Sequence, residues 1–367
     1  QMERMQSTWE NVVAHNLAES GVHPLRVEEL IPDQKDRQEL LRLELGYSQG
    51  NGTLELRRAI AGMYPGAEPD NVMVTNGSSE SLLLTAWMLT EPGDEVIVLL
   101  PNYMLTWGLV RSFGADVKPF RLVEERAWAP DLDQLNQAIS PRTKLIAVCN
   151  PNNPTGAVLS EDEMNQIIDA ARRAGDGGAW LLADEVYRGA ERVGDLTPTF
   201  WGRYDRVIVT NGLSKAYGLP GLRIGWLVST PELAERAWSY HDYATIGPSK
   251  VGDFLARVAL ADDVRPKLLA RTRGIIESNY ALLSDWIASQ GDMFSLVPPK
   301  AGAIAYLRYN FDMASLSFVE ALRDKKSVLI VPGAHFDMEY YLRIGFGSNA
   351  TLLREGLALI SGFISEL

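Results

Sequence analysis

The chain has 367 residues, of which 46% are hydrophobic and 22% are charged, and its formal net charge is −12. That length suits a large domain with a smaller one, and the composition is that of an ordinary globular protein. The negative charge argues against a nucleic-acid-binding protein, because a phosphate backbone requires a cationic face. No apolar run is long enough to span a membrane. The first four residues resemble neither a signal peptide nor a transit peptide.

The only cysteine, Cys149, ends an apolar run. No disulfide can form within the chain, so we expect a reducing, cytoplasmic compartment. A small buried hydrophobe is the better interpretation of this residue. The four histidines are scattered without metal-ligand spacing, and we expect no metal.

In chain order, residues 3–17 carry apolar side chains at helix-like spacing, and residues 53–63 predict a helix capped by Thr53. Between about 71 and 230, short β-rich runs alternate with helical patterns. The predicted strands are residues 72–75, 95–100, 144–149, 180–184, 206–210 and 224–229, and the predicted helices are residues 79–90, 104–113, 131–139 and 160–174. This alternation predicts a mostly parallel sheet covered on both faces, with ligands at the carboxyl ends of its strands.

The last third of the chain predicts a second, α+β domain. Residues 250–290 are strongly helical in pattern, and a helix is expected to close the chain at 351–366. Three short strands are predicted between them, at residues 303–309, 328–331 and 340–346.

Four segments that follow strands carry the chemistry. Lys215 precedes a Gly/Pro-rich loop with Arg223 eight residues later. An isolated loop lysine is usually a surface residue. An amine nucleophile beside a fixed guanidinium, however, suits a carbonyl cofactor that carries a phosphate.

The other three segments are weaker signals when taken singly. Residues 150–156 form an Asn/Pro-rich turn that could hold Asn153 rigidly toward a ligand. Asp184 ends a strand, with Tyr187 three residues later, and a lone aspartate there could equally be a helix cap. Residues 77–79 (Gly-Ser-Ser) open a helix, which is either an anion site or ordinary capping.

Together and in this order, the four segments resemble fold-type I pyridoxal-5′-phosphate enzymes of the class I/II aminotransferase family. The resemblance extends from Tyr47 to Arg343. It implies a large domain at residues 46–255, with a mostly parallel seven-stranded sheet. It also implies a small α+β domain made of residues 1–45 and 256–367.

The resemblance assigns cofactor roles by position. Lys215 would form the Schiff base with the cofactor and then move the substrate's proton. Asp184 would pair with the pyridine nitrogen, and Asn153 and Tyr187 would hydrogen-bond the 3′ oxygen. Tyr103 would stack on the ring. The phosphate would be held by Gly77, Ser78, Ser79 and Arg223, with Ser214 as a further candidate.

Substrate and partner roles follow in the same way. Arg343 would clamp the substrate α-carboxylate, with Asn153 beside it. Tyr47 matches a tyrosine that reaches the neighbouring subunit's phosphate, which implies a homodimer with shared active sites. Gly212 stands where the family often has a phosphate-binding serine. Glu19 is either a solvated loop residue or a substrate contact.

The leading functional hypothesis is an aminotransferase that acts on an L-amino acid and a 2-oxo acid. The same scaffold hosts cyclases, lyases and amino-acid oxidases, because the cofactor supplies the chemistry. An acidic residue such as Glu19 would suit a guanidinium, so an arginine-directed enzyme is the alternative. A ligand-sensing domain without catalysis is a weaker alternative, because Lys215, Asp184 and both arginines are present.

Overall fold

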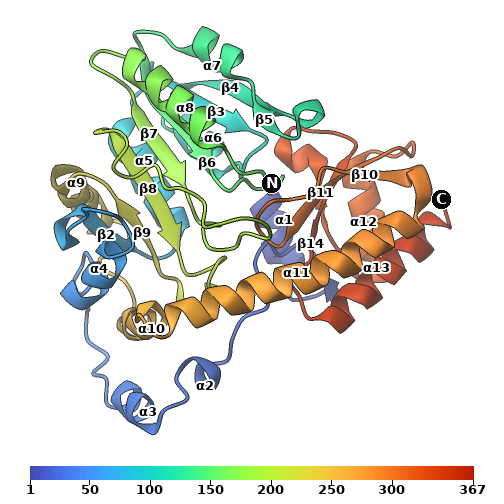
Figure 1. Ribbon diagram of the computed structural model, residues 1–367, viewed down its shortest axis with the longest axis horizontal. Helices are drawn as coiled ribbons and strands as arrows, with labels where there is room; N and C mark the ends of the chain where they lie inside the picture. The colour runs from blue at the N-terminus through green and yellow to red at the C-terminus, as the bar shows by residue number, and fades with distance from the viewer.

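The computed structural model describes residues 1–367 and has two halves of unequal size (Figure 1). The larger half contains a wide sheet with helices on both faces. The smaller half contains a four-stranded sheet packed against helices α12 (Ser315–Lys326) and α13 (Ala350–Ile364). The long helix α11 (Arg265–Ser289) runs along both halves (Figure 1).

The large sheet has the strand order β2-β9-β8-β7-β6-β3-β4-β5. Its strands are β2 (Val72–Thr75), β3 (Glu95–Leu100), β4 (Asp116–Val123), β5 (Ala129–Pro130), β6 (Thr143–Cys149), β7 (Trp180–Asp184), β8 (Val207–Gly212) and β9 (Gly225–Val228). All neighbours from β4 to β8 run parallel, whereas β9 is antiparallel to both β2 and β8. Seven strands therefore form the main sheet, and the two-residue β5 adds an eighth at its edge. Strand β4 escaped the sequence analysis because only two of its residues, Phe120 and Leu122, are buried, so it carries no continuous apolar run.

Helices separate these strands, as the pattern predicted. They are α4 (Leu54–Ala61), α5 (Ser78–Leu89), α6 (Leu105–Ser112), α7 (Leu132–Ala138), α8 (Glu161–Arg173) and α9 (Pro231–His241). Thr53 caps α4 by accepting from the Leu56 N–H, as expected from its residue type. The helices cover both faces, so β3, β7 and β8 are almost wholly buried.

The small half is built from segments far apart in the chain. Its sheet has the order β10 (Phe294–Leu296), β11 (Ile304–Tyr309), β14 (Tyr341–Gly345) and β13 (Val331–Pro332), all antiparallel. The N-terminal strand β1 (His15–Asn16) pairs in parallel with β12 (Val328–Leu329). Helix α10 (Lys250–Leu260) spans the predicted domain boundary at residue 255.

The helix expected over residues 3–17 is shorter than its apolar spacing indicated. Helix α1 covers only Met2–Trp9. The chain then becomes extended, because the backbone of residues 15–17 bonds to the edge of β12: His15 N donates to Ser327 O at 3.0 Å and Leu17 N donates to Leu329 O at 2.8 Å. Pairing with a distant strand overrides local helical spacing here.

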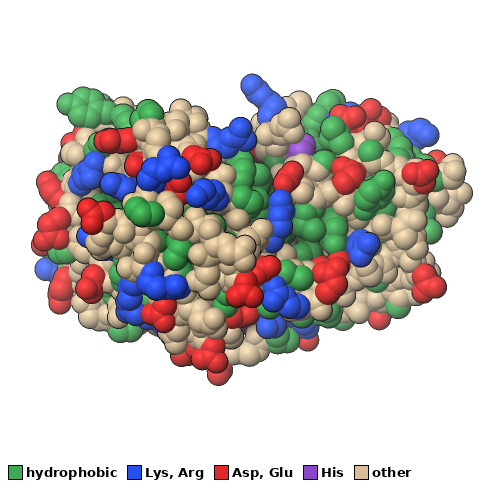
Figure 2. All heavy atoms as spheres, turned by 90° about the horizontal axis from the view of Figure 1, so that it is seen from above, with side chains coloured by type: hydrophobic (Ala, Val, Ile, Leu, Met, Phe, Trp, Pro, Cys, Tyr) green, Lys and Arg blue, Asp and Glu red, His purple; other side chains and the backbone are tan.

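Helices α2 (Val27–Leu30) and α3 (Gln34–Leu41) follow and lie apart from both sheets (Figure 1). Helix α3 buries none of its residues. On the face shown in Figure 2, acidic and basic side chains are interspersed, without a broad patch of either sign. None of the helices is both long and apolar enough to cross a bilayer.

Candidate active site

A cavity of about 290 Å³ lies at the carboxyl ends of the parallel strands. Strands β2, β6, β7 and β8 each end at a segment that contributes to it, so residues from four parts of the chain converge at one edge of the sheet. The cavity is lined by nine of the expected site residues: Ser78, Ser79, Tyr103, Asn153, Asp184, Tyr187, Ser214, Lys215 and Arg223. Arg343 and Glu19 complete it from the other half of the molecule.

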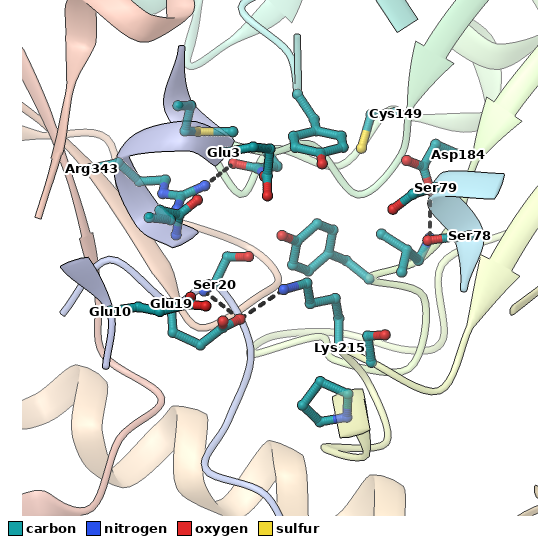
Figure 3. Close-up of a pocket in the computed structure, with 18 of the residues that line it drawn as sticks. Glu3, Glu10, Glu19, Ser20, Ser78, Ser79, Cys149, Asp184, Lys215 and Arg343 are labelled. Carbon is teal, nitrogen blue, oxygen red and sulfur yellow. Dashed lines mark hydrogen bonds and ion pairs between the residues drawn. The ribbon is translucent and has the colours of Figure 1, made fainter. Parts of the chain in front are cut away.

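The lysine predicted as the nucleophile is held by a carboxylate. Lys215 Nζ donates to Glu19 Oε1 at 2.7 Å, and Figure 3 shows the two side chains directed at each other. The attraction of Lys215 is the main cause that lowers the pKa of Glu19 to about 2. Burial opposes the charged amine, yet Glu19 and Tyr187 together raise the pKa of Lys215 above its ordinary value. Glu19 is therefore an ion-pair partner of Lys215 at the cavity wall, with 45% of its side-chain surface exposed.

The Glu19 carboxylate is fixed by its own backbone. Its Oε1 accepts from Ser20 N at 2.8 Å and from Gly21 N at 2.9 Å. These two bonds hold one carboxylate oxygen at the cavity wall whether or not Lys215 is present. Once Lys215 bonds to a cofactor, the fixed carboxylate remains as a site for another cationic group.

Asp184 lies at the opposite side of the cavity from Arg343 (Figure 3). It is buried, with 8% of its surface exposed, and one of its oxygens accepts from Val186 N at 3.1 Å. Burial raises the pKa of Asp184 to about 6. A buried carboxylate of this kind is stabilised by a cationic N–H partner, and a protonated pyridine ring would provide one.

Arg343 and Asn153 contact each other inside the cavity wall. Arg343 Nη1 donates to Asn153 Oδ1 at 2.9 Å, and Nη2 donates to Ala18 O at 2.5 Å. Arg343 is only 1% exposed, yet it forms no salt bridge, and its Nε has no partner. No salt bridge explains this buried arginine. Burial lowers its pKa, and the carboxylates of Glu19 and Glu3 oppose that effect without bonding to it, so the guanidinium can still bind a further anion.

The turn expected to bind phosphate is built around two glycines. Gly77 has a φ of +81°, and a Cβ there would lie 2.3 Å from the Arg223 guanidinium. A Cβ on Gly225 would lie 2.3 Å from Ser78 N. Glycine is therefore required at both positions for Arg223 and β9 to approach the turn. The first N–H groups of α5 have no helical partners and can bind an anion.

The departure at Gly212 faces this same turn. A Cβ at position 212 would lie 3.7 Å from Ser78 N and 3.1 Å from Ile224 O. The position is thus adjacent to the turn at Gly77–Ser79, and a side chain there would be tightly packed against β9. Ser214 lines the cavity two residues later.

Tyr103 and Tyr187 both line the cavity, whereas Tyr47 does not. Burial raises the pKa values of Tyr103 and Tyr187, so both hydroxyls are neutral hydrogen-bonding groups. Tyr47 is 86% exposed on its own chain. Its assignment to a neighbouring subunit's phosphate stays a prediction.

Helix α1 and the residue that follows it contribute side chains that the sequence analysis missed. Glu3, Gln6 and Glu10 line the cavity, and Figure 3 shows Glu3 close to Arg343. No local pattern indicated this, because the contact joins the two ends of the chain. By contrast, Arg188 and Glu191, which follow Tyr187, do not line the cavity: Arg188 Nε donates to Thr197 O, and Glu191 pairs with Arg273.

The comparisons with known proteins agree with this geometry. The family described as aminotransferase class I and II matches residues 16–360. This chain belongs to that family. The members are pyridoxal-5′-phosphate-dependent, so the protein is an enzyme of the pyridoxal-phosphate-dependent aminotransferase family with a fold-type I architecture.

Individual relatives differ in their activities. The chain is 33% identical to capreomycidine synthase of Streptomyces vinaceus, over 94% of this chain and 88% of that protein. It resembles the crystal structure of a PLP-dependent aminotransferase from Streptococcus suis, with a TM-score of 0.93 and 32% identity over 100% and 97% of the two chains. It also resembles the PLP-dependent cyclase OrfR, with a TM-score of 0.89 and 28% identity over 100% and 96%.

The residues present fit the cofactor. The glycine-formed cradle at Gly77 and Gly225 suits a phosphate, and buried Asp184 lies where a cationic ring nitrogen would stabilise its charge. Lys215 lines the same cavity as Asp184 and Ser78 (Figure 3). When bound, the cofactor supplies an electron sink for the carbon it activates.

Proposed function

We propose that this protein is an aminotransferase that moves an amino group between an L-amino acid and a 2-oxo acid. The observation that carries the proposal is Arg343, a buried guanidinium that forms no salt bridge and faces the same cavity as Lys215. Such a group binds the α-carboxylate that an amino acid and a 2-oxo acid share. It thereby orients the α-carbon toward the lysine.

The chain's own residues have separate tasks in this reaction. Arg343 and Asn153 hold the substrate carboxylate, and their mutual hydrogen bond fixes both side chains. Lys215, once free of the cofactor, would take the proton from the substrate α-carbon and pass it to the cofactor carbon that the lysine had occupied. The 2.7 Å contact with Glu19 stabilises the protonated amine, so Lys215 has to leave this contact to accept the proton.

The cofactor-loaded protein should be mixed with single L-amino acids, in air and under argon, while its visible absorbance is followed. With an aminotransferase we expect one stoichiometric conversion per site without an acceptor, and continuous turnover after a 2-oxo acid is added. The released 2-oxo acid is identified by mass spectrometry. Continuous turnover without any acceptor would contradict transamination and indicate a lyase, cyclase or oxidase.

A second candidate, an enzyme that cyclises or eliminates from an arginine-like amino acid, is favoured by the acidic residues of the cavity. Glu3, Glu10 and Glu19 all come from the N-terminal segment and lie on the side away from Ser78 and Asp184 (Figure 3). Carboxylates at that side suit a cationic side chain such as a guanidinium. The likeness to capreomycidine synthase and to a cyclase supports this candidate.

Arginine and citrulline distinguish a cationic side chain from a neutral one, because citrulline replaces the guanidinium with a urea of the same shape. If Glu3 binds the guanidinium, Glu3→Gln should lower kcat/KM for arginine roughly 10- to 100-fold and change citrulline by less than about twofold. Glu28→Gln, an exposed change in α2, serves as the control. Equal effects on both substrates would rule out recognition of the charge by Glu3.

We also propose a homodimer. Helix α3 buries no residue in its own chain, and Leu41, Leu45 and Tyr47 are each more than 80% exposed. An exposed apolar stretch of this kind is typical of an interface. The proposed substrates, an amino acid and a 2-oxo acid, are the same whether the protein is a monomer or a homodimer.

A further inference from the structure

A polar cluster lies directly behind the turn that is expected to bind phosphate. It contains Glu80 of α5, His241 at the end of α9, and the exposed Thr245 of the following loop. His241 is fully buried and Glu80 is 7% exposed. None of these residues lines the cavity, so none contacts substrate or cofactor. Burying a carboxylate and an imidazole together is costly unless they are paired and hydrogen-bonded, as they are here.

The contacts converge on one carboxylate. Glu80 Oε1 lies 3.1 Å from His241 Nδ1 and accepts from Thr245 Oγ1 at 2.6 Å. Its other oxygen, Oε2, accepts from Asn76 N at 2.6 Å. Asn76 Nδ2 then donates to Thr245 Oγ1 at 2.8 Å, which closes a ring of hydrogen bonds. Both carboxylate oxygens are therefore used within this one cluster.

Asn76 is the residue through which the cluster reaches the phosphate turn. It immediately precedes Gly77, and its carbonyl accepts from Arg223 Nη2 at 3.4 Å. The side chain and the backbone N–H of Asn76 are thus bonded to the cluster, and its carbonyl is bonded to a phosphate-binding residue. A change in Glu80, His241 or Thr245 would alter where residues 77–79 present their N–H groups.

We propose that His241, Glu80 and Thr245 are positioning residues that set the phosphate affinity of the turn at Gly77–Ser79. The inference rests on the assignment of this turn to the cofactor phosphate. Because the cluster acts through the turn alone, its loss should weaken binding of the phosphorylated cofactor. It should leave binding of the same ring without phosphate unchanged.

Thr245→Val removes the central hydroxyl and keeps the side-chain shape. The holoprotein is dialysed against graded pyridoxal 5′-phosphate, and occupancy is read from visible absorbance; the full chain is then titrated with pyridoxal. We expect about a tenfold loss of affinity for pyridoxal 5′-phosphate, and less than about a twofold change for pyridoxal. Thr245→Ser should restore wild-type affinity.

Thr85→Val is the control, because it makes the same substitution at a buried threonine of α5 whose hydroxyl bonds only to Ser81 O, outside the cluster. It should change neither affinity. His241→Asn places an amide at the Nδ1 position and should retain affinity, whereas His241→Leu should behave like Thr245→Val. If Thr245→Val folds poorly, the two His241 variants test whether the cluster sets the phosphate affinity.

Two results would overturn the proposal: wild-type affinity for pyridoxal 5′-phosphate in both Thr245→Val and His241→Leu, or an equal loss for both ligands. Ser78→Ala separates the underlying assignment from the cluster. If Ser78→Ala fails to weaken phosphate-dependent binding, the turn is not the phosphate site and the inference fails with it. If Ser78→Ala weakens it and Thr245→Val does not, only the positioning role is wrong.

Discussion

Lys215→Ala is expected to abolish turnover while the protein still folds. The variant loses both the amine that bonds to the cofactor and the base that moves the substrate's proton. Each role is worth several powers of ten, so kcat should fall by about 10⁴-fold or more. Steady-state kinetics with the best substrate from the amino-acid panel measures this loss.

Chemical labelling tests the same assignment independently of rate. Borohydride treatment of the wild-type holoprotein should abolish its visible absorbance and attach the cofactor covalently to Lys215, as mapped by peptide mass spectrometry. Lys144→Ala is a suitable control, because Lys144 is an exposed residue of β6 that does not line the cavity. A label on any other lysine, or turnover retained in Lys215→Ala, would show that another residue is the nucleophile.

The residues at the sheet edge of the cavity were predictable because each lies at or just after the end of a strand. Asp184 ends β7, and Asn153 and Lys215 come shortly after β6 and β8; these three strands are adjacent and parallel. Their carboxyl ends must meet at one edge of the sheet, so local patterns place these side chains together. The β6–β7 register also explains why Cys149 lines the cavity beside Asp184, because these two residues are paired across the strands.

The substrate side of the cavity was not predictable in the same way. Glu3 reaches a cavity shared with Arg343, and Glu19 contacts a lysine 196 positions away. These contacts depend on how the N-terminal segment crosses between the two halves. That path is fixed by the pairing of two-residue β1 with β12, which is too short to give a pattern. The same pairing explains why α1 ends early.

Arg343→Lys is expected to fold and bind cofactor but to process amino acids poorly. Lysine keeps the charge, but it replaces a planar fork with a point donor and cannot bond Asn153, Ala18 and a carboxylate with the same geometry. The loss of one charge-assisted bond predicts a fall in kcat/KM of roughly 10- to 150-fold. Kinetics on an amino acid and on the matching amine that lacks the carboxylate measures it.

The amine decides between substrate binding and a structural role for Arg343. If Arg343 clamps the carboxylate, the amine should react equally slowly with wild type and variant, because it has no carboxylate for arginine or lysine to bind. If Arg343 instead holds Asn153 and the Ala18 backbone in place, both substrates should suffer alike and the thermal midpoint should fall. Equal losses together with reduced stability would therefore exclude the carboxylate role. They would also remove the observation on which the proposed aminotransferase activity rests.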